Sequence, residues 1–277
     1  MSLSSIPQRA LVVGGTSGIG QGIALALAKR DCEVIVVGRS AQRGNEIVQQ
    51  LSALSPQKSH SFQSIDAFDL KSVKDIADRN DKKIDFLVLT HGMATIQGYT
   101  PTVNGIDQKL QLHYFSRIYL AKLMAPHMEE GSRILTVLSA GVHSKYNQFE
   151  DDFELKGTYS TKNAADAAGY YTDAGFERLS EEYPGLVVAH ACPGFVNTNW
   201  GTEFPWMLRM AIRPIQSFFA RTLEDCGEFM TQGCLDLSTK GFHLLDQDGK
   251  TFTGGIKHSP EDRDVIWERT LKLLPDL

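Results

Sequence analysis

Three glycines near the start of the chain have the spacing of a phosphate-binding loop. Gly14, Gly18 and Gly20 follow the apolar run of residues 10–13 and precede residues 23–29, which have a helical composition. A strand, a glycine turn and a helix in this order present backbone N–H groups to an anion. The glycines allow a sharp turn, a close approach of the backbone to the anion, and close packing of the helix on the strand. The loop therefore predicts a phosphate site, and a structural turn without a ligand is the alternative.

Arg39 follows the next apolar run, residues 33–37, and is placed to select between dinucleotides. In a βαβ unit, the residue at this point faces the adenosine ribose. An acidic side chain there would bind the 2′-hydroxyl, whereas a guanidinium without an acid beside it suits a 2′-phosphate. Arg39 therefore favours NADP over NAD, and a solvated surface arginine is the alternative.

The elements that must position these residues alternate between strands and helices. The predicted strands are residues 10–13, 33–37, 61–65, 84–89, 134–138, 186–191 and 242–245, and the predicted helices are residues 23–29, 41–54, 72–79, 105–128, 160–183, 224–237 and 260–274. This alternation implies parallel pairing and right-handed crossovers. We expect one α/β Rossmann domain over residues 1–277, a doubly wound, mostly parallel sheet of about seven strands with helices on both faces.

Ligands of an open parallel sheet bind beyond the carboxyl ends of its strands. The residues that directly follow the predicted strands are therefore the candidates for chemistry. They are the glycine loop, Arg39-Ser40, Asp66, residues 90–92, Ser139 and Pro193-Gly194. All of them are expected on one edge of the sheet.

The composition is that of an ordinary globular protein. With 42% hydrophobic and 22% charged residues over 277 positions, the chain can bury a substantial core. The net charge of −5 gives no support to a nucleic-acid partner, and no stable membrane insertion is expected. The four cysteines lack redox or metal-ligand spacing, which fits reduced thiols in a cytoplasmic protein. No metal is predicted, because the acidic run of residues 150–152 cannot converge on one point.

Taken together, these residues resemble the short-chain dehydrogenase/reductase family over nearly the whole chain. The loop from Gly14 to Gly20 matches the family's Thr-Gly-x-x-x-Gly-x-Gly pattern, with Val13 in place of the threonine. Residues 193–198 fit its Pro-Gly-x-Val-x-Thr segment, which lines the nicotinamide and its phosphates. Residues 89–92 stand where the family has Asn-Asn-Ala-Gly and keep only the glycine.

The resemblance implies a site for NADP(H), with Asp66 as the acid near the adenine and Asp69 as the alternative. The long interval of residues 139–159 is similar to that of the retinol-dehydrogenase-like branch. The implied cofactor-binding residues are Gly14, Thr16, Ser17, Gly18, Ile19, Gly20, Arg39, Ser40, Asp66, Gly92, Lys162, Pro193, Gly194, Val196 and Thr198.

The catalytic residues that the resemblance implies are Ser139, Tyr159, Lys162 and His113. In the family, a serine binds the substrate oxygen, a tyrosine gives or takes its proton, and a lysine lowers the tyrosine's pKa and holds the nicotinamide ribose. The family's tyrosine and lysine are four residues apart, whereas Tyr159 and Lys162 are three apart. On a helix this turns Tyr159 by roughly 100° around the axis, which an irregular helix start could recover. His113 stands where many members carry a relay asparagine, and it could serve that relay, replace the proton donor, or be a packed or surface histidine.

The function that the resemblance implies is an NADP(H)-dependent enzyme of the carbonyl reductase type. It would transfer a hydride between nicotinamide and a carbonyl or alcohol of a hydrophobic small molecule. The apolar residues 199–225 would cover that substrate, and a membrane contact or subunit interface is the alternative for them. A second hypothesis is a degenerate member that binds NADP(H) as a sensor or for a non-redox step. In the family, the helices expected at residues 105–128 and 160–183 pack against symmetry mates, so we expect a homodimer or homotetramer.

Overall fold

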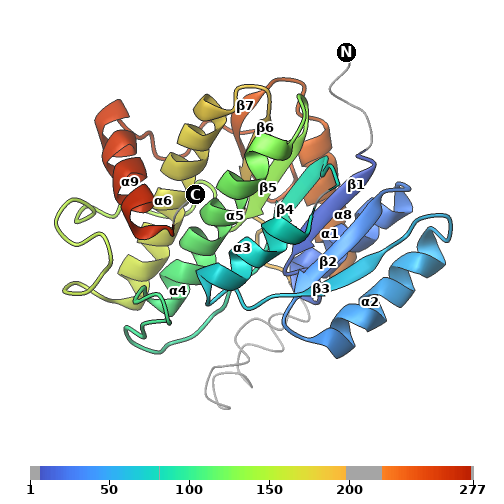
Figure 1. Cartoon of the computed structure of the whole chain (residues 1–277). Helices are drawn as coiled ribbons and strands as arrows, with labels where there is room; N and C mark the ends of the chain where they lie inside the picture. Colours follow the sequence, from blue (N-terminus) through green and yellow to red (C-terminus); the bar gives the residue numbers. More distant parts are fainter. Residues whose placement is uncertain (1–6, 81, 198–219, 276–277) are drawn as a thin grey trace.

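A seven-stranded sheet forms the centre of the protein in a computed structural model (Figure 1). The structure describes residues 7–80, 82–197 and 220–275. The strand order is β3-β2-β1-β4-β5-β6-β7, and all neighbouring strands pair in parallel. The strands are β1 (Arg9–Val13), β2 (Glu33–Gly38), β3 (Ser61–Ser64), β4 (Phe86–Leu89), β5 (Arg133–Val137), β6 (Val187–Ala191) and β7 (Gly241–Leu245). The predicted α/β class, with a doubly wound parallel sheet, is confirmed.

Helices cover both faces of this sheet because successive strand residues point to opposite sides. Leu11 and Val13 pack in one apolar layer, and Ala10 and Val12 pack in the other. The first layer contains α3 (Leu70–Arg79), α5 (Ser116–Met124) and α6 (Thr161–Glu182), and the second contains α1 (Gly18–Lys29), α2 (Ala41–Leu54) and α8 (Leu223–Leu235). Burial on both faces explains why the central strands read as continuous apolar runs.

The helix predicted over residues 105–128 is interrupted in the structure. It begins as the short α4 (Gln108–Leu110), passes through the π-helical turn η1 (Gln111–Phe115), and ends after α5 in the 3-10 turn η2 (Ala125–His127). The carboxylate of Asp107 caps α4 by accepting from the N–H of Lys109 at 3.0 Å. A π-helical turn is frequent at functional sites, and this one contains His113.

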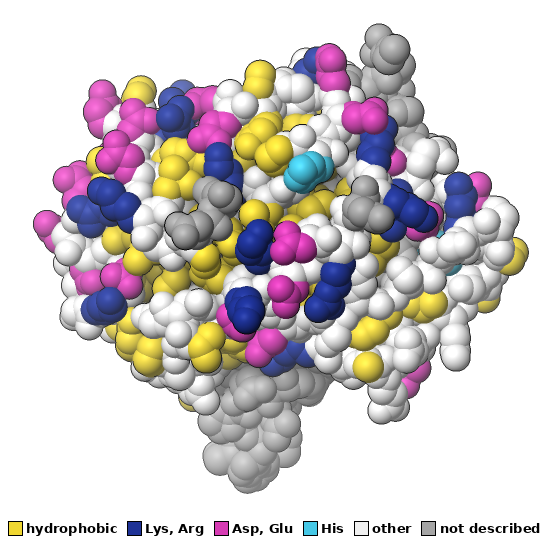
Figure 2. All heavy atoms as spheres, viewed as in Figure 1, with side chains coloured by type: hydrophobic (Ala, Val, Ile, Leu, Met, Phe, Trp, Pro, Cys, Tyr) yellow, Lys and Arg dark blue, Asp and Glu magenta, His cyan; other side chains and the backbone are white. Residues whose placement is uncertain are grey.

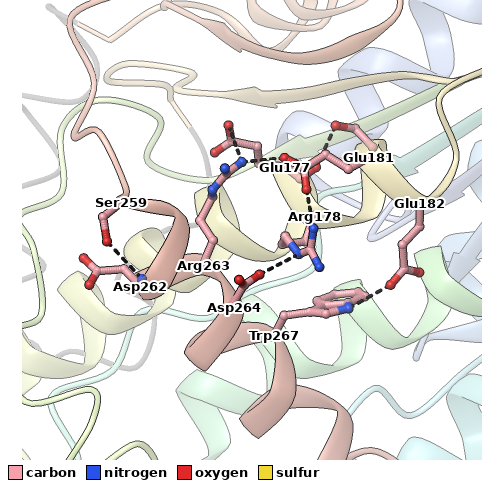
Figure 3. A network of polar contacts seen from close by, with 10 residues as sticks. Glu177, Arg178, Glu181, Glu182, Ser259, Asp262, Arg263, Asp264 and Trp267 are labelled. Carbon is pink, nitrogen blue, oxygen red and sulfur yellow. Dashed lines mark hydrogen bonds and ion pairs between the residues drawn. The ribbon is translucent and has the colours of Figure 1, made fainter.

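The last helix, α9 (Pro260–Leu273), lies beside α6 (Figure 1), and side chains of the two helices meet in a polar network (Figure 3). Ile266 and Trp267 are its buried apolar residues. Arg263 pairs with Glu177 at 2.9 Å and with Glu181 at 2.6 Å, which connects the polar edges of the two helices. The predicted homodimer or homotetramer stays a prediction, and an interface on this side of α6 would have to include α9.

Acidic and basic side chains are interspersed over the face of the molecule viewed in Figure 2. Surface ion pairs of the described residues include Lys145 with Asp262 at 2.6 Å and Arg178 with Asp264 at 3.4 Å. In the part of the chain that the structure describes, no helix combines the length and apolar character needed to cross a membrane.

Candidate active site

A cavity of about 690 Å³ lies at the carboxyl ends of the central strands. Most of the cofactor residues implied by the sequence line it. These are Gly14, Thr16, Ser17, Gly18, Ile19, Gly20, Arg39, Gly92, Pro193, Gly194 and Val196. Ser40, Asp66 and Lys162 do not belong to the lining, and Thr198 lies outside the described residues. The cavity extends from the ends of β2 and β3, through the glycine loop, to the ends of β5 and β6.

The glycine loop fits the diphosphate of a dinucleotide. Gly14 has a φ of +86°, which favours glycine, and its N–H donates to the carbonyl of Val37 at 2.9 Å. A Cβ at Gly20 would collide with the carbonyl oxygen of Gly14 and the hydroxyl of Thr90. The side chain of Ser17 makes no capping hydrogen bond, so the first N–H groups of α1 are left for an anion.

Arg39 lies at the β2 end of the cavity, next to an aromatic residue that the sequence did not single out. Its guanidinium carbon is 5.7 Å from the centre of the Phe68 ring, and both residues line the cavity. The neighbouring Ser40 serves as the N-cap of α2, where its hydroxyl accepts from the N–H of Arg43 at 3.3 Å. The Asp66 carboxylate accepts from the N–H of Phe68 at 3.1 Å, so Asp66 shapes the loop that carries the ring.

Asp69, the alternative to Asp66 for the adenine, is the N-cap of α3 and accepts from the N–H of Lys71 at 3.0 Å. Its carboxylate therefore already has a structural partner.

His113 lines the middle of the cavity, and its Nε2 accepts from the N–H of Met93 at 3.0 Å. Burial, together with the charge of Arg117, lowers the pKa of His113 to about 3. The imidazole is therefore neutral at physiological pH, and it fixes the backbone of the loop that follows β4. A neutral histidine with this low pKa is a poor proton donor.

Arg117 is a fully buried cation at the edge of the same cavity. Its guanidinium donates to the carbonyl of His91 at 2.6 Å, to the carbonyl of Val137 at 2.8 Å and to the hydroxyl of Thr136 at 3.0 Å. Burial lowers the pKa of Arg117 to about 9. Arg117 thus joins the ends of β4 and β5 through neutral acceptors and adds positive charge beside the cavity.

Ser139 directly follows Leu138, a lining residue at the end of β5. Its N–H donates to Nε2 of His190 at 3.1 Å. Its side-chain oxygen is buried and has no hydrogen-bond partner within the described ranges.

Tyr159 and Lys162 have contacts of their own, and neither lines the cavity. The hydroxyl of Tyr159 accepts from the ammonium of Lys109 and donates to the carbonyl of Gln97 at 3.1 Å. Lys162 is exposed and pairs with Asp166, one helical turn further along α6. Burial and the charge of Asp107 raise the pKa of Tyr159 to about 12. The structure therefore brings His113 to the cavity and Ser139 beside it, whereas Tyr159 is held by Lys109.

The sequence reasoning did not identify Phe68 or Arg117 as residues of the site. Arg117 carried a detectable signal, since it is a charged residue four positions after His113 in an otherwise apolar helical stretch. Phe68 had no comparable signal, because its contact with Arg39 depends on the fold of the loop after β3.

Comparison with known proteins gives a consistent family match. Residues 8–205 match the family described as short chain dehydrogenase. The oxidoreductase AN1596 of Emericella nidulans is 30% identical over 247 residues, which cover 85% of this chain and 71% of that protein. The short-chain dehydrogenase/reductase SAT2 of Stachybotrys chartarum is 27% identical over 252 residues, or 80% of this chain and 70% of that protein.

Solved structures show the same fold at lower identity. MalC, a reductase/Diels-Alderase from Malbranchea aurantiaca, has a TM-score of 0.68 at 17% identity, with 90% of this chain and 97% of that chain covered. A short chain dehydrogenase from Burkholderia cenocepacia in complex with NADP has a TM-score of 0.63 at 22% identity, with 88% and 97% covered.

Proposed function

The chain belongs to the short-chain dehydrogenase family, and on that basis we propose that this oxidoreductase uses NADP(H) to reduce a carbonyl or oxidise an alcohol. The substrate is a hydrophobic small molecule. The observation that carries the choice of cofactor is Arg39, which lies over Phe68 at the edge of the cavity. Within the described ranges, Arg39 forms no ion pair with a carboxylate, so its charge is available to a 2′-phosphate. The Burkholderia cenocepacia structure, which is in complex with NADP, supports this choice.

The residues of the cavity fit a dinucleotide in a defined order. The glycine loop and the first turn of α1 would hold the diphosphate, and Arg39 with the N-terminus of α2 would hold the 2′-phosphate. Pro193, Gly194 and Val196 would lie along the nicotinamide end. When bound, the nicotinamide supplies or accepts the hydride, and the protein contributes alignment.

The substrate would occupy the end of the cavity near β5 and β6, and several apolar residues of the lining are available to contact it. These residues are Met93, Ala94, Leu112, Leu138 and Phe195. The predicted covering segment, residues 199–225, lies largely outside the described residues. An apolar lining favours a hydrophobic carbonyl compound over a charged one.

In this proposal, the Ser139 hydroxyl binds the substrate oxygen and the Tyr159 hydroxyl gives or takes its proton. Tyr159 would first have to exchange its hydrogen bond to Gln97 for one to the substrate. Catalytic hydrogen bonds often form only in the substrate complex, so the contacts of the free protein are compatible with this role. Lys162 would have to leave Asp166 to bind the nicotinamide ribose.

A second candidate function is NADP(H) binding for a sensing or non-redox role. The observation that favours it is that Lys109 and Gln97 occupy the hydroxyl of Tyr159, while Lys162 is paired with Asp166. The fold neighbour MalC, described as both a reductase and a Diels-Alderase, is consistent with a non-redox step on this fold.

A two-stage experiment separates the two functions. Fluorescence titration with NADPH and NADH measures cofactor binding, and tighter NADH binding would contradict the role of Arg39. NADPH oxidation is then followed with a panel of hydrophobic aldehydes, ketones and quinones. Turnover of any of them supports the carbonyl reductase, whereas tight NADPH binding without turnover supports the second candidate.

Three further parts of the proposal rest on the sequence. The protein would be cytoplasmic, as its cysteine usage suggests; it would form a homodimer or homotetramer, as the family resemblance implies; and its layout would be that of the retinol-dehydrogenase-like branch. Light scattering measures the oligomeric state, and a monomer would contradict the second of these.

A further inference from the structure

Two buried histidines and one buried aspartate form a closed ring with the backbone of Ser139. On one side, the N–H of Ser139 donates to Nε2 of His190 at 3.1 Å, and Nδ1 of His190 lies 2.5 Å from Asp173. On the other side, Nδ1 of His143 lies 2.9 Å from the carbonyl of Ser139, and Nε2 of His143 lies 3.2 Å from Asp173, an ion-pair contact without hydrogen-bond geometry. The two carboxylate oxygens of Asp173 thus face one histidine each. We call these three side chains the His143–Asp173–His190 ring.

The hydrogen-bond partners determine the protonation of each imidazole. Since the N–H of Ser139 donates to Nε2 of His190, His190 carries its single proton on Nδ1 and donates it to Asp173. For His143, Nδ1 faces a carbonyl and Nε2 faces a carboxylate, and both of these are acceptors. Because each ring nitrogen of His143 faces an acceptor, we assign His143 as an imidazolium and Asp173 as ionised. The buried ring has no net charge.

The electrostatics of the buried groups agree with this assignment. Burial lowers the pKa of His143, but the contact with Asp173, the hydrogen bond to the carbonyl of Ser139 and the charge of Asp166 together outweigh burial, and the net shift is upward. Burial also lowers the pKa of His190, and the contact with Asp173 offsets this lowering only in part. Burial raises the pKa of Asp173, but the two histidines outweigh it and the net shift is downward.

The fold makes specific room for the ring. Gly169 lies inside α6, where a glycine is unfavourable by about 1 kcal/mol relative to alanine. A Cβ at this position would lie only 2.6 Å from both Cβ and Nδ1 of His143. The glycine therefore lets the His143 ring pack directly on the helix backbone. The imidazoles of His143 and His190 are also stacked, with centroids 6.2 Å apart and planes 19° apart.

We propose that Asp173, His143 and His190 are positioning residues for Ser139, and that His143 acts in this way as an imidazolium. The ring contacts both the N–H and the carbonyl of Ser139 and so fixes the backbone of this residue. The hydroxyl of Ser139 would then be held in place to bind the substrate oxygen, a consequence that rests on the proposed function. Loss of one proton from His143 at alkaline pH would leave one ring nitrogen with its lone pair facing an acceptor, either the Asp173 carboxylate or the Ser139 carbonyl, and would loosen the loop.

The charged groups around the ring come from several elements. The charge of Asp166 on α6 raises the pKa of His143. The charge of Arg117 on α5 lowers the pKa of His190. The charge of Asp173 raises the pKa of His258, before α9, and that of His143 lowers it, while the charge of Asp173 raises the pKa of Glu177 on α6. Among these, Asp173 is the group in direct contact with both imidazoles.

The first experiment does not depend on activity. Histidine side-chain NMR of the full chain, labelled with ¹⁵N, is recorded as a function of pH, with His143→Asn used to assign the His143 signal. We expect His143 to titrate above the ordinary value of about 6.5 and to return toward or below it in Asp173→Asn. A His143 pKa at or below the ordinary value in the wild-type chain would overturn the proposal.

The second experiment measures turnover of phenanthrenequinone with NADPH across pH. We expect Asp173→Asn and Gly169→Ala to lower kcat by roughly a hundredfold, comparable to Ser139→Ala, with NADPH affinity nearly unchanged. We also expect the alkaline decline of kcat to disappear in Asp173→Asn. Gly169→Ala keeps every charge, so it tests positioning separately from charge; because the added methyl group overpacks against His143, urea unfolding of this variant accompanies the kinetics.

His60→Gln is the matched control for these variants. His60 also joins a backbone N–H, that of Val34 at 3.1 Å, to a side chain, that of Ser55 at 2.8 Å, but it does so away from the cavity. Wild-type kcat and pH profile in both Asp173→Asn and Gly169→Ala would overturn the positioning role. If the wild-type chain reduces no carbonyl, the proposed function fails, and the NMR titration alone decides on the ring.

Discussion

Lys109 donates a hydrogen bond to the hydroxyl of Tyr159, and this lysine lies 50 positions before the tyrosine in the chain. Its ammonium also lies 4.9 Å from the centre of the Tyr159 ring. The sequence suggested Lys162 as the partner, but Lys162 pairs with Asp166. A cation therefore does lie beside Tyr159, and it comes from α4 instead of α6.

Tyr159→Phe tests whether this hydroxyl takes part in proton transfer. Under the proposed function, we expect turnover of carbonyl probes to fall by roughly 10²–10⁴-fold while NADPH affinity stays unchanged, because only the proton donor is lost. Lys109→Met should lower turnover more than Lys162→Met, since Lys109 is the lysine in contact with the hydroxyl. Steady-state kinetics with NADPH measures all three variants. Full turnover in Tyr159→Phe would remove this residue from the mechanism.

Arg39→Gln tests the choice of cofactor. We expect NADPH affinity to fall by roughly tenfold to a hundredfold and NADH affinity to change little, because only NADPH carries the 2′-phosphate. Fluorescence titration with both dinucleotides gives the ratio of the NADPH and NADH affinities. The control is Arg43→Gln, since Arg43 is paired with Glu46 at 2.6 Å and does not line the cavity. An equal loss for both dinucleotides would show that Arg39 does not discriminate between them.

Phe68 should also affect the ratio of NADPH to NADH affinity, through its contact with Arg39. A cation–π contact at an exposed site contributes about 0.5–1 kcal/mol, so Phe68→Leu should weaken NADPH by roughly twofold to fivefold. Phe68→Tyr keeps an aromatic face and serves as the control with near wild-type affinity. The same titration measures both variants. The double variant Arg39→Gln/Phe68→Leu is then compared with Arg39→Gln alone. If Phe68→Leu weakens NADPH binding in the wild type but not in the Arg39→Gln background, Phe68 acts through Arg39. Additive losses would argue against that coupling.

The fold and the phosphate loop were predictable from the sequence because both depend on short-range patterns. Each central strand is an apolar run buried on both faces, and Gly14, Gly18 and Gly20 sit between a strand and a helix. The break in the helix over residues 105–128 was not predictable, because a π-helical turn adds one residue to a turn without changing composition.

The partners of the candidate catalytic residues were less predictable, because they depend on the path of a loop. The carboxylate of Asp152 accepts from the N–H groups of Lys156, Gly157 and Thr158, each at 2.8 Å. This fixes the backbone just before Tyr159 and directs its side chain toward Lys109. The same reason hid the His143–Asp173–His190 ring, whose members come from a loop, a helix and a strand.

Gly20→Ala tests the packing of the phosphate loop. The added methyl group would collide with the carbonyl of Gly14 and the hydroxyl of Thr90, so the loop must shift. Overpacking of this kind destabilises by about 1–3 kcal/mol, and we expect at least a tenfold loss of NADPH affinity. Gly98→Ala is the matched control, because nothing lies within 4 Å of a Cβ there. Titration with NADPH compares the two, and equal affinities would mean that the loop adapts without loss.

The pH dependence of stability tests the charges of the His143–Asp173–His190 ring. The folded pKa of His143 is raised, so its contribution is present below its unfolded pKa and is lost as the pH rises through the folded value. The folded pKa values of Asp173 and His190 are lowered, so their contributions are lost as the pH falls through the folded values. Urea unfolding of the wild type and Asp173→Asn should therefore differ most between roughly pH 5 and pH 7. The difference should shrink on both sides of this window.

The control for this prediction is Glu46→Gln, which removes an exposed ion pair and should change stability by less than about 1 kcal/mol at any pH. A difference between the wild type and Asp173→Asn that is constant with pH would contradict the assigned charges.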